Sequence, residues 1–287
     1  MRLFALILIS AAVTFAQNDP VFRSTVSLVR VDVQAIDAGG HVVSGLTKDD
    51  FRVLDEGNAQ APVNFSFDEE PLDLILLFDT SGSMHGKLLT VVRATELGFN
   101  ELHKSDRVCV RAFSDTSTEV LPFSSDLQSV NIAILTQVLK LKFGGASRLE
   151  PAADEAALRF RGEPKTHRKR AVLIVTDKPG AREPNEAAVV RDVWNADAVL
   201  SELILDRGQK GGNEIVDKTG GITITAGEPG EAFRDSVHYL RSGYTMYYAL
   251  PEGSSGVERK LQVELTPEAA RRFANVRIHA RSGYIAP

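Results

Sequence analysis

Four apolar runs without polar alternation constrain the fold of this 287-residue chain more than any other feature. They read LDLILLFD from residue 72, RVCVRAF from residue 107, RAVLIVTD from residue 170 and VLSELILD from residue 199. Segments with helical periodicity separate them, as in residues 88–104 and 185–197. Strands buried on both faces that alternate with helices are typical of a doubly wound, mostly parallel α/β sheet. We therefore expect such a domain over residues 72–242.

The residues on both sides of this region alternate apolar and polar side chains instead. SLVRVDVQAID, from residue 27, predicts a half-buried strand of an antiparallel sheet, and YTMYYALP, RKLQVELTP and ANVRIHARSGY predict three more strands near the end of the chain. Three or four strands make only a thin core. We therefore expect residues 22–70 and 243–287 to form the two halves of one small β-sandwich, with the α/β domain inserted between them.

The first sixteen residues, MRLFALILISAAVTFA, have one positive charge, a short apolar stretch and small residues at the end. This pattern predicts a secretory signal peptide over residues 1–16, and hence an exported protein that is periplasmic or secreted, with no membrane anchor in the mature chain. A single cysteine, Cys109, excludes an internal disulfide. The formal charge of −5 and the lack of any run of five like charges argue against nucleic acid as a partner.

Oxygen-bearing side chains cluster where the expected strands end. Asp79 closes the first strand, and the turn that follows it contains Ser81 and Ser83 before a helix that we expect to begin near Met84. Asp177 closes another strand, and Ser147 lies in a glycine-containing loop before a further helix. In a doubly wound sheet, ligands bind beyond the carboxyl ends of the strands. Three hydroxyls and two carboxylates suit a hard cation, Mg²⁺ or Mn²⁺, although Asp-Thr-Ser-Gly-Ser also suits a plain helix cap.

These motifs resemble the metal-ion-dependent adhesion site of the von Willebrand factor type A domain over residues 72–242. DTSGS matches its Asp-x-Ser-x-Ser loop, Ser147 takes the position of a threonine, and Asp177 that of an aspartate. The flanks resemble those of a bacterial, in particular acidobacterial, subfamily of exported proteins with this domain. The resemblance implies that Ser81, Ser83 and Ser147 contact the metal directly and that the two aspartates act mostly through water. It also implies that a glutamate or aspartate of a protein partner fills an open coordination position.

The sequence therefore favours a non-enzymatic protein that binds a protein partner through a metal. The alternative is a structural or assembly protein of the cell envelope, in which the metal site is structural or vestigial. A remote alternative is a phosphatase with Asp79 as the nucleophile. Such enzymes place a second aspartate two residues later as the general acid and base, and this chain has Ser81 there.

Overall fold

The computed structural model describes residues 27–287 apart from 165–166, 180–184, 207, 209–212 and 226–227. The predicted signal peptide lies outside these residues. Within the described part of the chain, no helix is long and apolar enough to cross a membrane.

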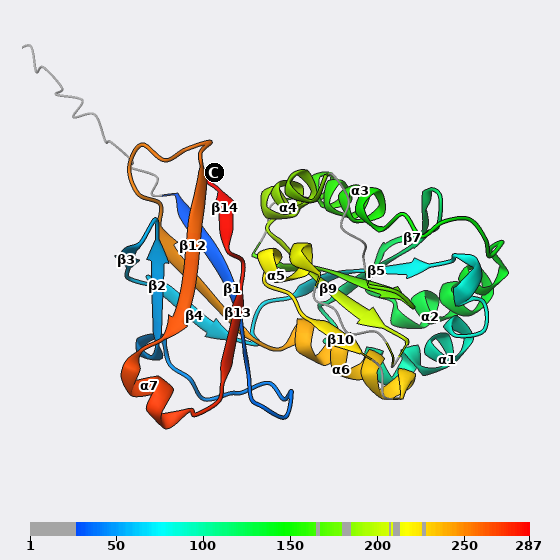
Figure 1. Cartoon of the computed structure of the whole chain (residues 1–287), viewed down its shortest axis with the longest axis horizontal. Coiled ribbons are helices and arrows are strands. Elements are labelled where there is room, and N and C mark those ends of the chain that lie inside the picture. The colour runs from blue at the N-terminus through cyan, green and yellow to red at the C-terminus, as the bar shows by residue number, and fades with distance from the viewer. Residues whose placement is uncertain (1–26, 165–166, 180–184, 207, 209–212, 226–227) are drawn as a thin grey trace, which may run out of the picture.

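A six-stranded sheet forms the centre of the larger unit, on the right in Figure 1, with the strand order β10-β9-β8-β5-β6-β7. All neighbouring strands are parallel except β6 and β7, which are antiparallel. The strands are β5 (Leu72–Asp79), β6 (Arg107–Phe113), β7 (Ser117–Ser124), β8 (Lys169–Thr176), β9 (Ala198–Ile204) and β10 (Thr223–Thr225). The predicted fold class, a doubly wound and mostly parallel α/β sheet, is confirmed.

Helices cover both faces of this sheet, which explains why its strands show no polar alternation. Leu74, Leu76 and Phe78 of β5 pack into the core between the sheet and α1, α2 and α6. Ile75 and Leu77 pack into the core on the other face, between the sheet and α3, α4 and α5. The helices are α1 (Leu88–Phe99), α2 (Leu127–Thr136), α3 (Leu149–Arg161), α4 (Glu186–Asn195), α5 (Glu214–Thr219) and α6 (Pro229–Arg241), with short 3₁₀ turns at Gly82–Met84 (η2) and Val138–Lys140 (η3). Every residue of β5 is buried.

Strands from both flanks of the chain build the smaller unit, on the left in Figure 1. Its two antiparallel sheets have the orders β13-β1-β11-β4 and β14-β12-β2-β3. The first flank supplies β1 (Leu28–Ile36), β2 (Phe51–Asp55), β3 (Asn58–Gln60), β4 (Asn64–Phe67) and the 3₁₀ turn η1 (Lys48–Asp50). The second flank supplies β11 (Tyr244–Ala249), β12 (Glu258–Leu265), α7 (Pro267–Arg272), β13 (Arg277–Ala280) and β14 (Gly283–Ile285). The predicted sandwich of interleaved flanks is thus present in the fold.

Two details of the flanks differ from the sequence prediction. The last predicted strand is two strands, because the chain leaves one sheet after Ala280 and enters the other at Gly283. A short helix, α7, lies between the last two predicted strands, where Thr266 caps it by accepting a hydrogen bond from the amide of Ala269 at 3.3 Å.

The polar face of β1 is also buried, although alternation predicted that it faces solvent. Arg30 and Gln34 are 9% and 7% exposed, because the α/β unit packs against this side of the strand. The Arg30 guanidinium donates to the carbonyl of Arg168 at 2.8 Å and pairs with Glu70 at 2.9 Å. The polar side of β1 therefore lies at the junction between the two units, where hydrogen bonds and ion pairs replace contacts with water.

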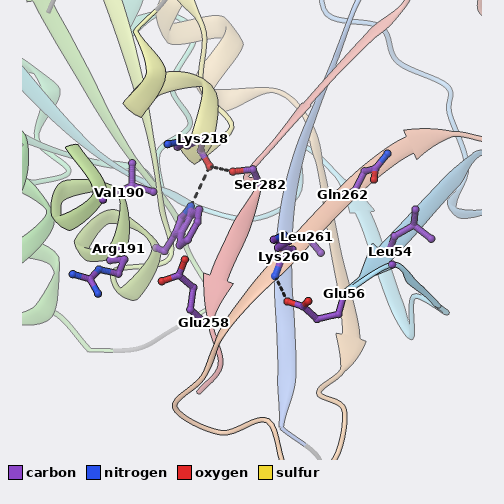
Figure 2. Close-up of a pocket in the computed structure, with 13 residues that line it drawn as sticks. Leu54, Glu56, Val190, Arg191, Lys218, Glu258, Lys260, Leu261, Gln262 and Ser282 are labelled. Atoms are coloured by element: carbon purple, nitrogen blue, oxygen red, sulfur yellow. Dashed lines mark hydrogen bonds between the residues drawn. The ribbon is translucent and has the colours of Figure 1, made fainter. Parts of the chain in front are cut away.

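The junction also contains a hollow of about 910 Å³ between α4 and the β14-β12-β2-β3 sheet. Figure 2 shows its lining, with Val190 and Arg191 on one side and Leu54, Lys260 and Gln262 on the other.

The chain passes from the sandwich to the α/β unit between β4 and β5 and returns between α6 and β11. That residues 22–70, 72–242 and 243–287 correspond to separate folding units stays a prediction.

Candidate metal centre

The first loop of the candidate site follows the central strand β5. Asp79 is the last residue of that strand, and Gly82–Met84 form the 3₁₀ turn η2. Helix α1 begins at Leu88 and not near Met84 as predicted. The amides of Met84 and Lys87 each donate to the carbonyl three residues earlier, and Gly82 and Gly86 disfavour a regular helix in this segment. The loop is therefore longer, and it extends to Lys87.

Asp79 is fully buried, and three donors surround its carboxylate. One oxygen accepts from the amide of Ser81 at 2.7 Å. The other accepts from the hydroxyls of Ser147 and Thr176, both at 2.7 Å. Asp79 therefore ties together the first loop, the loop that contains Ser147 and the end of β8. With its oxygens already taken by protein donors, Asp79 suits an indirect role beside a cation.

Ser83 and Asp177 connect the first loop to the third. The Ser83 hydroxyl donates to Asp177 Oδ1 at 3.0 Å, and its oxygen lies 3.5 Å from that of Ser81. Asp177 is 2% exposed, whereas Ser83 is exposed. Because a carboxylate only accepts hydrogen bonds, the Ser83 and Ser147 hydroxyls act as donors to Asp177 and Asp79. The lone pairs of both hydroxyl oxygens therefore stay available.

Backbone hydrogen bonds hold the Ser147 loop against the end of the sheet. The amide of Gly144 donates to the carbonyl of Thr80 at 3.0 Å, and the amide of Ala146 donates to Asp115 Oδ1 at 2.9 Å. Gly145 has a φ of +79°, and a Cβ at this position would lie 2.1 Å from Asp115 Oδ2. Glycine is therefore required between the two anchored amides.

A lysine lies at the edge of the cluster. Lys87 Nζ donates to Asp177 Oδ2 at 2.9 Å and lies 3.6 Å from Asp206 Oδ2. The hydrogen bond to Asp177, together with the charges of both carboxylates, raises the pKa of Lys87 above its ordinary value. The cluster therefore contains one fixed positive charge beside its carboxylates.

The residues present fit a hard divalent cation. All five predicted site residues have oxygen atoms in their side chains, and the Ser81 and Ser83 hydroxyl oxygens are 3.5 Å apart, near the separation of about 3 Å between adjacent ligands of an octahedral Mg²⁺. In the described part of the chain, no group of three or more His, Cys, Asp or Glu residues could hold a metal. The donor set therefore depends on serine hydroxyls, which disfavours a soft metal.

The structure brings the five predicted residues, Asp79, Ser81, Ser83, Ser147 and Asp177, into one hydrogen-bonded cluster. Sequence reasoning missed Thr176, Lys87 and Asp115. Thr176 precedes Asp177 directly, so its place at a strand end was a usable signal. Lys87 and Asp115 gave none, because their positions depend on the path of the first loop and on the turn between β6 and β7.

Comparison with known proteins places these features in a family. No curated protein matches the chain. One similar solved structure is an aerotolerance-related membrane protein from Bacteroides fragilis, with 18% identity over 59% of this chain and 98% of that one, and a TM-score of 0.48. A von Willebrand factor type A protein from Catenulispora acidiphila has 13% identity over 92% of this chain and 75% of that one, and a TM-score of 0.49.

A third similar structure is proximal thread matrix protein 1 from the mussel byssus, solved with a zinc-occupied metal-ion-dependent adhesion site (MIDAS) motif. It has 13% identity over 64% of this chain and 49% of that one, and a TM-score of 0.48.

Residues 74–180 match the family model of the von Willebrand factor type A domain. This segment contains every predicted site residue and runs from β5 through the end of β8. This segment of the chain is therefore identified as a von Willebrand factor type A domain.

Proposed function

We propose that this protein binds a protein partner through a divalent cation, Mg²⁺ or Mn²⁺, held by Asp79, Ser81, Ser83, Ser147 and Asp177. The observation that carries the proposal is the pair of hydrogen bonds Ser147–Asp79 and Ser83–Asp177, which join three loops at one end of the sheet. Each bond orients a hydroxyl so that its lone pairs are available to a cation. Ser81, Ser83 and Ser147 are the direct ligands in this proposal, and the two aspartates orient them.

The bound cation would supply a Lewis acid that accepts an anionic oxygen ligand. In this proposal the two carboxylates accept hydrogen bonds from the protein and do not bind the cation directly, so the cation keeps an attraction for a glutamate or aspartate side chain of the partner. The cluster has no group placed as a general acid beside Asp79, because Ser81 occupies that position. We therefore propose a binding role and not a catalytic one.

We also propose that the protein is exported to the periplasm or secreted, which rests on the signal-like pattern of residues 1–16. Sequencing the N-terminus of protein from the native host tests this. A start near Gln17 supports export, and a start at Met1 contradicts it.

The metal-dependent partner is tested by affinity capture from an envelope extract. Immobilised wild type should retain a protein in Mg²⁺ and release it into a chelator, and Ser83→Ala should not retain it. Ser125→Ala, an exposed serine remote from the candidate site in the chain, is the matched control and should behave as wild type. Capture of the same protein by Ser83→Ala, or retention in the chelator, contradicts the proposal.

A second candidate function is a structural or assembly role in which no metal is needed. The ammonium of Lys87 favours it, because this group already supplies positive charge to the buried Asp177. In that case, removal of divalent cations should change neither the melting temperature nor the assembly state. The two functions therefore differ in their response to a chelator.

A further inference from the structure

Lys87 occupies a position between two carboxylates of different exposure. It is the residue just before α1, and its ammonium lies 2.9 Å from Asp177 Oδ2 and 3.6 Å from Asp206 Oδ2. The Asp177 side chain is 2% exposed, whereas that of Asp206 is 43% exposed. The lysine thus reaches from solvent toward the buried carboxylate, with a second carboxylate beside its path.

The same Asp177 carboxylate binds both Lys87 and Ser83. Oδ1 accepts from the Ser83 hydroxyl at 3.0 Å while Oδ2 accepts from the lysine. A dication held by the Ser83 oxygen would therefore lie within a few ångströms of the ammonium, and like charges at that distance repel strongly when one of them is partly buried. The observed position of Lys87 is therefore compatible with a metal-free site and disfavours metal binding.

We infer that Lys87 is an internal cation that competes with the metal for Asp177, and that it moves to Asp206 when the metal binds. This inference rests on the proposed metal-binding function. Asp206 is placed to receive the ammonium, since 3.6 Å already lies within ion-pair distance. The exchange keeps Asp177 compensated in both states, because either the ammonium or the metal faces it. Lys87 thereby lowers the affinity for metal and stabilises the metal-free protein.

The first test replaces the lysine by an uncharged side chain of similar length. In calorimetric titrations, Lys87→Met should bind Mg²⁺ and Mn²⁺ about tenfold more tightly than wild type, because the repulsion is gone. In chelator, the same variant should melt at a lower temperature, because buried Asp177 loses its counter-charge. Addition of Mg²⁺ should therefore raise its melting temperature more than that of wild type.

A matched control distinguishes specific competition from a change in net charge. Lys178 is exposed and directly follows Asp177, so Lys178→Met removes the same charge near the same carboxylate. Its metal affinity should stay within about threefold of wild type, as expected for a solvated charge. An equal gain in affinity for both variants would overturn the specific role of Lys87.

The second test concerns the receiving carboxylate. Asp206→Asn removes the alternative partner, so the ammonium should stay at Asp177 and metal affinity should fall by a few fold. In a Lys87→Met background, Asp206→Asn should have almost no further effect, because the competitor is absent. Equal effects of Asp206→Asn in both backgrounds would show that Asp206 acts on the metal directly, and would overturn the exchange.

The outcomes separate this inference from the proposed function. Wild type and Lys87→Met that bind metal with the same affinity overturn the inference and leave the proposed function in place. Binding by Lys87→Met but not by wild type supports the inference and contradicts metal-dependent binding in the natural protein. Absence of binding in both variants overturns both.

Discussion

Ser147 and Asp79 are 68 residues apart in the chain, and a 2.7 Å hydrogen bond joins them. Asp79 is fixed at the end of the central strand, whereas Ser147 lies in a loop before α3. This bond closes the loop over the sheet and orients the serine hydroxyl. It thereby joins two separate segments of the candidate metal centre.

Ser147→Ala should leave the fold intact and weaken metal binding. Asp79 keeps its bonds to the Ser81 amide and the Thr176 hydroxyl, so the buried carboxylate stays paired. Loss of the ligand and of its orienting bond should reduce the Mn²⁺ affinity by about tenfold or more in a calorimetric titration. Ser147→Thr retains the hydroxyl and should bind within a few fold of wild type. Equal affinities for the alanine and threonine variants would remove Ser147 from the site.

Asp55→Ala should destabilise the β-sandwich severely. This carboxylate is fully buried and accepts from the hydroxyls of Tyr248 at 3.0 Å and Tyr284 at 2.8 Å, and from Arg259 Nε at 2.8 Å. Because these partners come from the other flank of the chain, their loss leaves buried polar groups unpaired across both sheets. We expect the free energy of unfolding to fall by about 3–5 kcal/mol.

Urea denaturation followed by the fluorescence of the single tryptophan, Trp194, measures this effect. The matched control is Asp49→Asn, an exposed carboxylate near the same sheet, which should change the free energy of unfolding by less than about 0.5 kcal/mol. A similar loss in both variants would show that Asp55 has no special structural role.

Stability should depend on the protonation of Asp154 on α3. Burial and the neighbouring Asp192 carboxyl raise the pKa of Asp154 to about 6, although Arg161 opposes this shift. The folded protein therefore holds this proton more tightly than the unfolded chain, whose aspartates titrate near pH 3.9 on average. The contribution of Asp154 to stability is greatest below about pH 4 and is lost as the pH rises through about 6.

Asp154→Asn should remove this part of the pH dependence. Urea midpoints measured from pH 4 to pH 8 should fall less steeply with pH for the variant than for wild type. Glu96→Gln, which changes an exposed carboxylate on α1, is the control and should follow the wild-type profile. Parallel profiles for wild type and Asp154→Asn would show that this carboxyl titrates normally.

The sequence predicted the strands of the α/β sheet correctly where helices bury both faces of the sheet. LDLILLFD contains no alternation, and β5 is buried along its whole length. The prediction was wrong for the polar face of β1, because Arg30 and Gln34 look solvent-facing in a single strand and become buried only when the other unit packs on them. Period two indicates a polar face, but it does not say whether water or another domain covers that face.

The candidate site was predictable in its residue types and not in its charge balance. Asp79 and Asp177 end apolar runs, so their place at one edge of the sheet follows from the topology. Lys87 follows from no pattern, because a helix beginning near Met84 would have placed it on the first turn. The 3₁₀ turns between Ser81 and Lys87 instead bring its ammonium to Asp177.

Calorimetric titration of the full-length protein with Mg²⁺, beside Ser83→Ala and the control Ser125→Ala, tests the metal centre most directly. Ser83 is exposed and its removal changes little volume, so the variant should fold as wild type does. We expect one Mg²⁺ per wild-type chain, unchanged affinity in Ser125→Ala, and an affinity lower by about tenfold or more in Ser83→Ala. Equal affinity in wild type and Ser83→Ala, or no binding by correctly folded wild type, would contradict it.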